Sequence, residues 1–147
     1  MPMAQQEVEL EFLLLGESAD NPNGKLYLMG GGWSRIQSPV FPTVARCGIA
    51  VCVKVTYPAT ESVSIHLRYS NDAKTVQMEM DGQIQPRQIH PGVSNHKSQR
   101  IFFVLNGNFP VPAPGMYEIS ASLPDGQVKT VNFEANAIKM PIPKGVG

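Results

Sequence analysis

The strongest constraint on the fold is an alternation of apolar and polar side chains with a period of two residues. In "SVSIHLRYS" the apolar residues Val63, Ile65, Leu67 and Tyr69 are separated by single polar residues. Because successive side chains of an extended strand point to opposite faces, this pattern predicts a strand with one buried face. The same period recurs in "EVELEF" (7–12), "VARCGIAVCVKVTY" (44–57) and "TVQMEMDG" (75–82).

The alternation assigns one face of each segment to the core and the other to solvent. In "EVELEF", Glu7, Glu9 and Glu11 form the solvated face of an edge strand, where charge discourages wrong pairing. Further strands are predicted at "KLYLM" (25–29), "RIFFVLN" (100–106), "MYEISASL" (116–123) and "QVKTVNFEA" (127–135). The residues predicted to point inward outside "SVSIHLRYS" are Val8, Leu10, Phe12, Cys47, Ile49, Val51, Val53, Val55, Tyr57, Val76, Met78, Met80, Tyr117, Ile119, Ala121, Leu123, Val131 and Phe133.

Turn-forming residues separate these strands. Asp81-Gly82 is predicted to end one strand, and Pro124-Asp125-Gly126 is a hairpin signal. In "PVPAPGMYEI" (110–119), prolines hold the chain extended before Tyr117, whose hydroxyl is placed to bond back to upstream backbone as in a tyrosine corner. The functional alternative for this segment is a proline-rich ligand for an aromatic groove.

Helices are not expected, because Gly or Pro interrupts every candidate helical stretch and the chain holds 13 of each. The pattern predicts an all-β fold: a single antiparallel β-sandwich, immunoglobulin-like or C2-like, of about seven to nine strands. Residues 1–147 form one domain, with 136–147 a Pro/Gly-rich tail. The polar, turn-rich stretch 82–98 is the longest predicted loop.

Composition and charge narrow the partners and the cellular compartment expected for the chain. Twelve basic and twelve acidic side chains cancel, so no charge draws the chain to nucleic acid or an anionic membrane. No apolar run approaches the ~18 residues of a membrane span, and the N-terminus lacks the pattern of a signal peptide. If they lie on one strand, Cys47 and Cys52 are about 16 Å apart on opposite faces, too far for a disulfide. Two free thiols fit a reducing, cytoplasmic compartment.

The stretch "GKLYLMGGGW" (24–33) suggests a phosphate-binding loop or a binding surface. A phosphate loop requires a following lysine and a helix start, and Pro39 and Pro42 leave no place for that helix. The three glycines therefore predict a bulge or bend in a strand. Trp33 then either fills the core or, if exposed, forms a binding anchor with Arg35.

No catalytic, metal or cofactor site is assigned. His90 and His96 share one loop and could bind a metal only with further ligands, so they are kept as a possible interaction surface together with Trp33 and Arg35. His66 is expected to be solvated, and Asp72 and Asp81 to serve turns rather than acid-base chemistry. The cysteines lie in apolar strands that raise a thiol pKa, which argues against a nucleophile.

The motifs "GKLYLMGGGWSRI", "PAPGMYEISASLPDGQ" and the closing "VNFEA" occur in that order around a long apolar strand. Over roughly residues 8–135 the chain resembles a family of small uncharacterised bacterial proteins. The resemblance implies a β-sandwich in a bacterial or phage setting, and it implies no activity.

The expected function is a non-enzymatic module that binds a protein, or itself, through a sheet edge or end loops. One alternative is a structural subunit of a larger assembly such as a phage particle or sheath, which would place the chain in a virion. The other is a small-ligand or metal-binding protein that uses the 82–98 loop.

Overall fold

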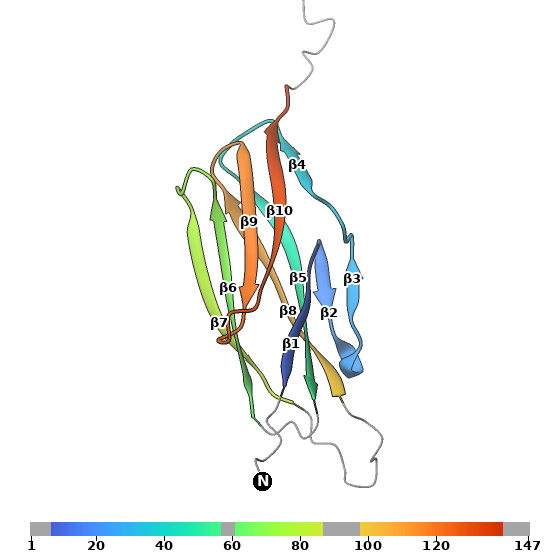
Figure 1. Cartoon of the computed structure of the whole chain (residues 1–147). Helices are drawn as coiled ribbons and strands as arrows, with labels where there is room; N and C mark the ends of the chain where they lie inside the picture. Colours follow the sequence, from blue (N-terminus) through green and yellow to red (C-terminus); the bar gives the residue numbers. More distant parts are fainter. Residues whose placement is uncertain (1–6, 57–60, 87–97, 140–147) are drawn as a thin grey trace, which may run out of the picture.

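The computed structural model of the chain describes residues 7–56, 61–86 and 98–139. In these ranges the chain forms strands and one short 3-10 turn, η1 (Pro22–Gly24), without an α-helix (Figure 1). The all-β prediction is therefore confirmed. The expected number of strands was too low, because the described residues contain strands β1 to β10.

The strands form two main sheets and a small hairpin. The sheets are antiparallel except that β4 runs parallel to β10, which corrects the expectation of purely antiparallel pairing. The first sheet has the order β1 (Val8–Gly16), β5 (Thr43–Thr56), β8 (Ser98–Val111). The second has the order β4 (Arg35–Ser38), β10 (Val128–Ala137), β9 (Gly115–Ser122), β6 (Val63–Asn71), β7 (Gln77–Ile84), and the hairpin pairs β2 (Ser18–Asp20) with β3 (Tyr27–Met29).

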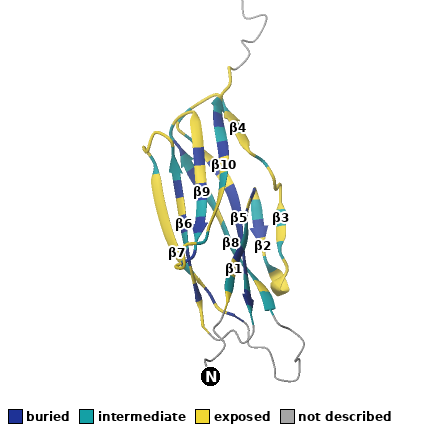
Figure 2. Cartoon of the chain, in the orientation of Figure 1, coloured by how far each residue is buried: buried dark blue, intermediate teal, exposed yellow. Residues whose placement is uncertain are grey.

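The core contains the alternating apolar residues of both main sheets, and Figure 2 shows the buried positions along their strands. In β6 the predicted pattern is confirmed, since Val63, Ile65, Leu67 and Tyr69 are all buried and their neighbours are not. The inward residues of β9 and β10 are confirmed in the same way: Tyr117, Ile119, Ala121 and Phe133 are buried, with Leu123 just after β9, and Val131 is half-buried.

The middle of the long strand β5, residues 47–53, is buried on both faces, whereas the alternation predicts one solvated face. The hairpin strand β2 lies over the outer face of β5 at Gly48, where a Cβ would come 2.5 Å from the backbone of Ser18. The Asn106 side chain of β8 fastens this cover, donating to the Ala19 carbonyl and accepting from its N–H, both at 2.8 Å. Cys52, on the same outer face, is inaccessible as well, and its Sγ donates to the Glu11 carboxylate at 3.5 Å.

Strand β1 contains a bulge that the sequence pattern does not reveal. The register with β5 shifts between Leu10 and Phe12, so Phe12 points to the outer face and Leu13 takes the buried position. The Phe12 ring lies 6.2 Å from that of Phe102, centroid to centroid. The prediction that Phe12 points into the core is therefore wrong.

Strand β7 also departs from the prediction. It continues through Asp81 and Gly82 to Ile84, so the predicted Asp81-Gly82 turn is wrong and the 82–98 stretch begins as a strand. Gly82 is needed there for packing, because a Cβ would come 2.8 Å from the Phe103 ring of β8. Met78 and Met80, predicted to be buried, are 47% and 40% exposed at the edge of the second sheet.

The two predicted corners at the ends of the sheets are present. The Tyr117 hydroxyl donates to the Ala113 carbonyl at 2.6 Å, as expected for a tyrosine corner. At the hairpin, the Gly126 N–H donates to the Leu123 carbonyl at 3.0 Å, and Gly126 has a φ of 100° that favours glycine. Strand β10 runs to Ala137, so the predicted tail 136–147 begins as strand, and residues 140–147 lie outside the described ranges.

Candidate functional site

The three glycines form a turn that moves the chain from the small hairpin to the second sheet. Gly30 and Gly32 have φ values of 61° and 85°, a region in which glycine is favoured. The Gly32 N–H donates to the Leu15 carbonyl at 3.1 Å, which ties this turn to the end of β1. The turn thus carries the chain from β3 to β4 and places Trp33 immediately before β4.

Trp33 lies between the two expected extremes, since it is partly buried and packs against the core. Its ring centroid is 5.3 Å from that of Phe133. Its indole Nε1 is inaccessible and has no hydrogen-bond partner within the described ranges. A buried indole N–H normally finds an acceptor, so this donor is an unusual feature.

Beside Trp33 a cleft of about 450 Å³ separates β4 from the first part of β5. We name it the Trp33 cleft. Its lining combines an aromatic ring, aliphatic side chains, hydroxyls and charges of both signs. The lining residues are Glu17, Trp33, Arg35, Ile36, Gln37, Ser38, Thr43, Val44, Ala45 and Arg46.

One wall of the cleft is the free edge of β4. The carbonyls of Ser34 and Ser38 accept hydrogen bonds from β10 at 2.9 and 3.0 Å. Because alternate residues of a strand direct their backbone groups to opposite edges, those of Arg35 and Gln37 point away from β10. Strand β4 is the last strand of its sheet, so these groups have no strand partner in the described part of the chain.

The opposite wall is a second free edge, on β5. Strand β1 ends at Gly16, opposite Gly48, so the beginning of β5 pairs only with β8. The Thr56 N–H donates to the Glu7 carbonyl at 2.9 Å, which shows that even-numbered residues of β5 direct their backbone groups toward the β1 side. Val44 and Arg46 therefore direct theirs toward the Trp33 cleft.

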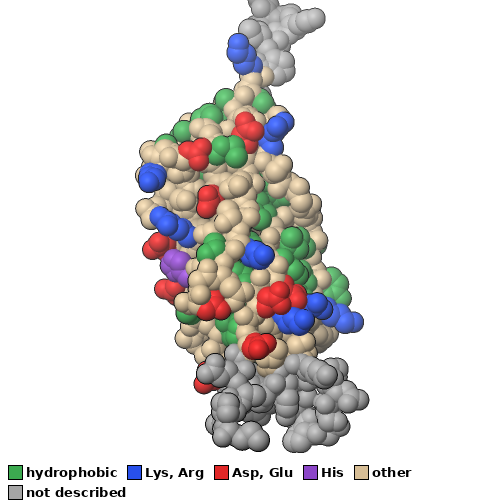
Figure 3. All heavy atoms as spheres, in the orientation of Figure 1, with side chains coloured by type: hydrophobic (Ala, Val, Ile, Leu, Met, Phe, Trp, Pro, Cys, Tyr) green, Lys and Arg blue, Asp and Glu red, His purple; other side chains and the backbone are tan. Residues whose placement is uncertain are grey.

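The charged side chains around the cleft are accessible. The Arg35 guanidinium lies 3.8 Å from the Glu134 carboxylate, with side chains 62% and 43% exposed, so this pair contributes little to stability. Arg46 is exposed and has no ion pair in the described ranges. On the face of the molecule seen in Figure 3, acidic and basic side chains are interspersed rather than gathered into a patch of one sign.

The structure brings together two of the four residues predicted as an interaction surface. Trp33 and Arg35 both line the Trp33 cleft, whereas His90 and His96 lie outside the described residues. Sequence reasoning missed Arg46 and the free backbone edges, because it could not tell how far β1 accompanies β5. The one available signal was the glycine turn before Trp33.

The other side chains considered as chemical groups are either buried, as the two cysteines are, or paired, as His66 and Asp81 are. Burial raises the pKa of both thiols, Cys47 and Cys52, to about 12, and both cysteines are free. His66 is paired rather than simply solvated: its Nδ1 lies 2.7 Å from the Asp81 carboxylate, and that hydrogen bond raises the pKa of the imidazole. Asp81 lies in β7 rather than in a turn. Within the described ranges no three His, Cys, Asp or Glu side chains are placed to hold a metal ion.

A bilayer-spanning helix is also absent from the described ranges, where no helix has the required length and hydrophobicity.

Comparison with known proteins identifies the family to which the chain is similar. The model of a protein family of unknown function (DUF6941) matches residues 11–136. No curated protein matches the chain. The match agrees with the expected uncharacterised family, and its bacterial or phage setting stays a prediction.

Proposed function

The chain belongs to this family of unknown function, and we propose that it is a protein-interaction module that binds its partner in the Trp33 cleft. One observation carries the proposal: two strand edges without a strand partner in the described ranges face a cleft lined by Trp33, whose buried indole N–H has no acceptor in those ranges. Free strand edges bind extended peptides through backbone hydrogen bonds, and an unsatisfied buried donor favours a ligand that brings an acceptor.

We further propose that the scaffold is an immunoglobulin-like β-sandwich rather than a C2-like one. The support comes from the two main sheets sharing one core and from the tyrosine corner at the start of β9. Strand β4 is paired with β10 and β5 with β8, so both edges are held in place before the partner arrives. Preorganised edges lower the entropic cost of binding.

The proposed ligand is an extended segment that adds a strand to the cleft. Its backbone forms hydrogen bonds with Val44 and Arg46 of β5, along the part of the β5 edge that β1 does not pair with beyond Gly16. Each such hydrogen bond contributes about 0.5–1.5 kcal/mol net. A carboxylate on the segment suits Arg46, which has no ion pair in the described ranges. An acceptor on the segment satisfies the Trp33 Nε1 only if binding turns the indole, because that atom is inaccessible in the free protein.

Site-specific crosslinking tests this assignment on the full chain. A photoreactive residue at Gln37, which lines the cleft, is compared with one at Val128, which is 54% exposed outside it. In cells of the source organism we expect a discrete crosslinked protein from Gln37 and none from Val128. Crosslinking to the same partners at both positions, or at neither, contradicts the proposal.

A cytoplasmic location is proposed with this function, because two buried free thiols suit a reducing compartment. The alternative of a small-ligand or metal site in the 82–98 loop stays a prediction, since His90 and His96 lie outside the described residues. The alternative of a structural subunit is favoured by a separate feature at the opposite edge of the molecule.

A further inference from the structure

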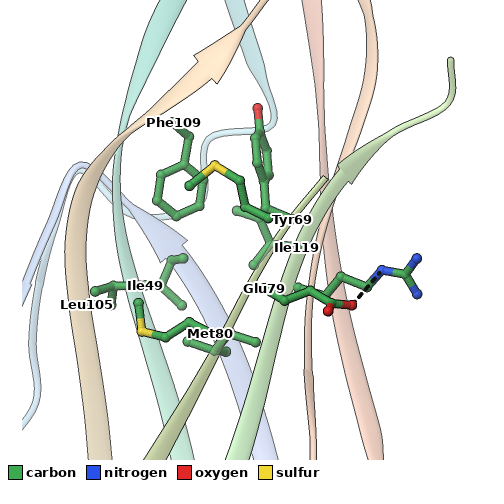
Figure 4. Close-up of a pocket in the computed structure, with 10 residues that line it drawn as sticks. Ile49, Tyr69, Glu79, Met80, Leu105, Phe109 and Ile119 are labelled. Atoms are coloured by element: carbon green, nitrogen blue, oxygen red, sulfur yellow. Dashed lines mark ion pairs between the residues drawn. The ribbon is translucent and has the colours of Figure 1, made fainter. Parts of the chain in front are cut away.

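A second, smaller cleft lies between β7 and β8, at the edge opposite β4. We propose that it receives residues 140–147 of a second copy of this chain, which add a strand to β8. The cleft has a volume of about 110 Å³ and includes Ile49, Met80, Leu105 and Phe109 in its lining (Figure 4). We name it the methionine cleft, and the proposal rests on none of the features of the Trp33 cleft.

The methionine cleft is shaped to take apolar side chains. Apart from Arg68 and Glu79 its lining residues are apolar or aromatic, and they include the Tyr69 and Phe109 rings, whose centroids lie 4.8 Å apart. Apolar cavities of about 150 Å³ bind groups as large as benzene, so this one has room for one or two aliphatic side chains. Its Met80 side chain is partly exposed and flexible, and methionine adapts to a partner's shape.

The adjoining edge of β8 has free backbone groups. Strand β8 is the last strand of the first sheet. The Phe102 carbonyl accepts from Asn21 Nδ2 at 3.1 Å and the Pro110 carbonyl from the Tyr69 hydroxyl at 2.7 Å, so even-numbered residues of β8 direct their backbone groups outward. Between them, Val104 and Asn108 direct theirs to an edge without a strand partner in the described part of the chain.

The C-terminal sequence "MPIPKGVG" (140–147) fits this edge. Met140 and Ile142 are two residues apart, so an extended conformation puts them on one face. Pro141 and Pro143 have the opposite parity, so the two missing N–H groups lie at the same edge of the segment. The segment can therefore pair along one edge only, which suits the outermost strand of a sheet.

Charge supports the same occupant. Strand β7, which borders the methionine cleft, carries Glu79 and Asp81 and no cation. Arg68 of β6 lies 3.8 Å from Glu79 and His66 lies 2.7 Å from Asp81, and both carboxylates remain exposed. The segment that would lie beside β7 carries Lys144 and no acidic side chain, and Lys139 directly precedes it. These basic side chains thus meet an acidic strand, and exposed carboxylates on β7 disfavour pairing of β7 with another β7.

The position of the donor segment favours a second copy over the same chain. The Ile138 N–H donates to the Ser38 carbonyl of β4, so β10 delivers the segment beside β4. In the second sheet β4 and β7 are opposite edges, which places donor and acceptor on opposite sides of the molecule (Figure 1). A head-to-tail contact of this kind joins copies into open chains unless its rotation closes a ring.

Sedimentation velocity of the full chain over a range of concentrations tests the proposal. We expect association that grows with concentration and that Ile142→Asp weakens about tenfold or more, since an apolar anchor becomes charged. Met80→Lys should weaken it similarly from the acceptor side. The matched controls are Met116→Lys, at a methionine that is equally 40% exposed outside the cleft, and Val128→Asp.

Mixing the two interface variants gives the decisive result. The Met80→Lys chain keeps an intact donor segment and the Ile142→Asp chain keeps an intact cleft, so the mixture should form heterodimers and nothing larger. A wild-type chain that stays monomeric, as it would if the segment bound its own cleft, overturns the proposal. So does a mixture that remains monomeric, or an Ile142→Asp chain that associates like the wild type. The Trp33 cleft is intact in every variant, so these failures leave the proposed function unaffected.

Discussion

Replacement of Trp33 by phenylalanine separates the stability of the fold from the function proposed for its cleft. The indole packs on Phe133 and is partly buried, while its Nε1 is inaccessible without an acceptor in the described ranges. An unsatisfied buried donor costs about 1–3 kcal/mol. Loss of part of the ring's apolar contact costs a similar amount, of the order of 1–2 kcal/mol for a half-buried group. These two changes oppose each other in Trp33→Phe.

We therefore expect Trp33→Phe to alter the free energy of unfolding by no more than about 1 kcal/mol. Trp33→Ala, which also empties the space beside Phe133, should cost about 2–3 kcal/mol, less than a fully buried ring. The assay is urea unfolding monitored by far-UV circular dichroism, because Trp33 is the only tryptophan and both variants lose tryptophan fluorescence. Crosslinking of a partner at Gln37 should fall in both.

A loss of about 3 kcal/mol or more in Trp33→Phe would refute this reasoning. Such a loss would mean that the indole N–H already has an acceptor in the free protein, for example an ordered water. The donor would then be part of the fold, and the Trp33 cleft would lose one of the two features that mark it as a binding site.

Three other predictions concern polar and titratable groups. Tyr117→Phe should lower the free energy of unfolding by about 1 kcal/mol in urea, because it removes the hydrogen bond of the tyrosine corner while keeping the buried ring. In an NMR titration the pKa of His66 should lie above its ordinary 6.5, and it should fall in Asp81→Asn. Because the folded pKa is the higher one, the His66–Asp81 pair stabilises the fold below pH 6.5, and this contribution is lost as pH rises through the folded pKa. Cys47 and Cys52 should resist a thiol reagent at pH 8 until urea unfolds the chain, because both are inaccessible and burial raises their pKa to about 12; rapid labelling of the folded protein would contradict their burial.

The alternation of residue types predicted the strands best where one face meets the core and the other meets water. Strand β6 satisfies that condition and its pattern is reproduced residue by residue. Strand β5 does not, because β2 covers its outer face at Gly48. Nothing near Gly48 in the sequence reveals that cover, which depends on the path of the chain between β1 and β5.

Errors at the sheet edges have a different cause. The bulge that turns Phe12 outward changes the phase of the alternation within one strand, and no residue in "EVELEF" marks it. Asp81-Gly82 looks like a turn, yet Gly82 is kept small by the Phe103 ring of the facing strand. Both features are set by contacts distant in sequence.

The candidate site was predicted only in part for the same reason. The glycine turn and Trp33 are visible in the sequence, and they indicated that the chain leaves one sheet there. The free edge of β5 follows from where β1 stops pairing, at Gly16 opposite Gly48. That endpoint is a property of the assembled sheet, so the sequence identified the aromatic residue and missed the backbone beside it.

Substitution of Val44 by proline tests the central claim most directly, because it removes a backbone N–H that faces the Trp33 cleft without removing a bond to β8. Proline is tolerated at such edge positions, and Val44→Ala serves as the matched control for the loss of the side chain. With the photoreactive residue at Gln37, strand addition predicts that Val44→Pro lowers the yield of crosslinked partner about fivefold or more, while Val44→Ala keeps it near wild type. An undiminished yield in a correctly folded Val44→Pro chain would contradict strand addition at this edge.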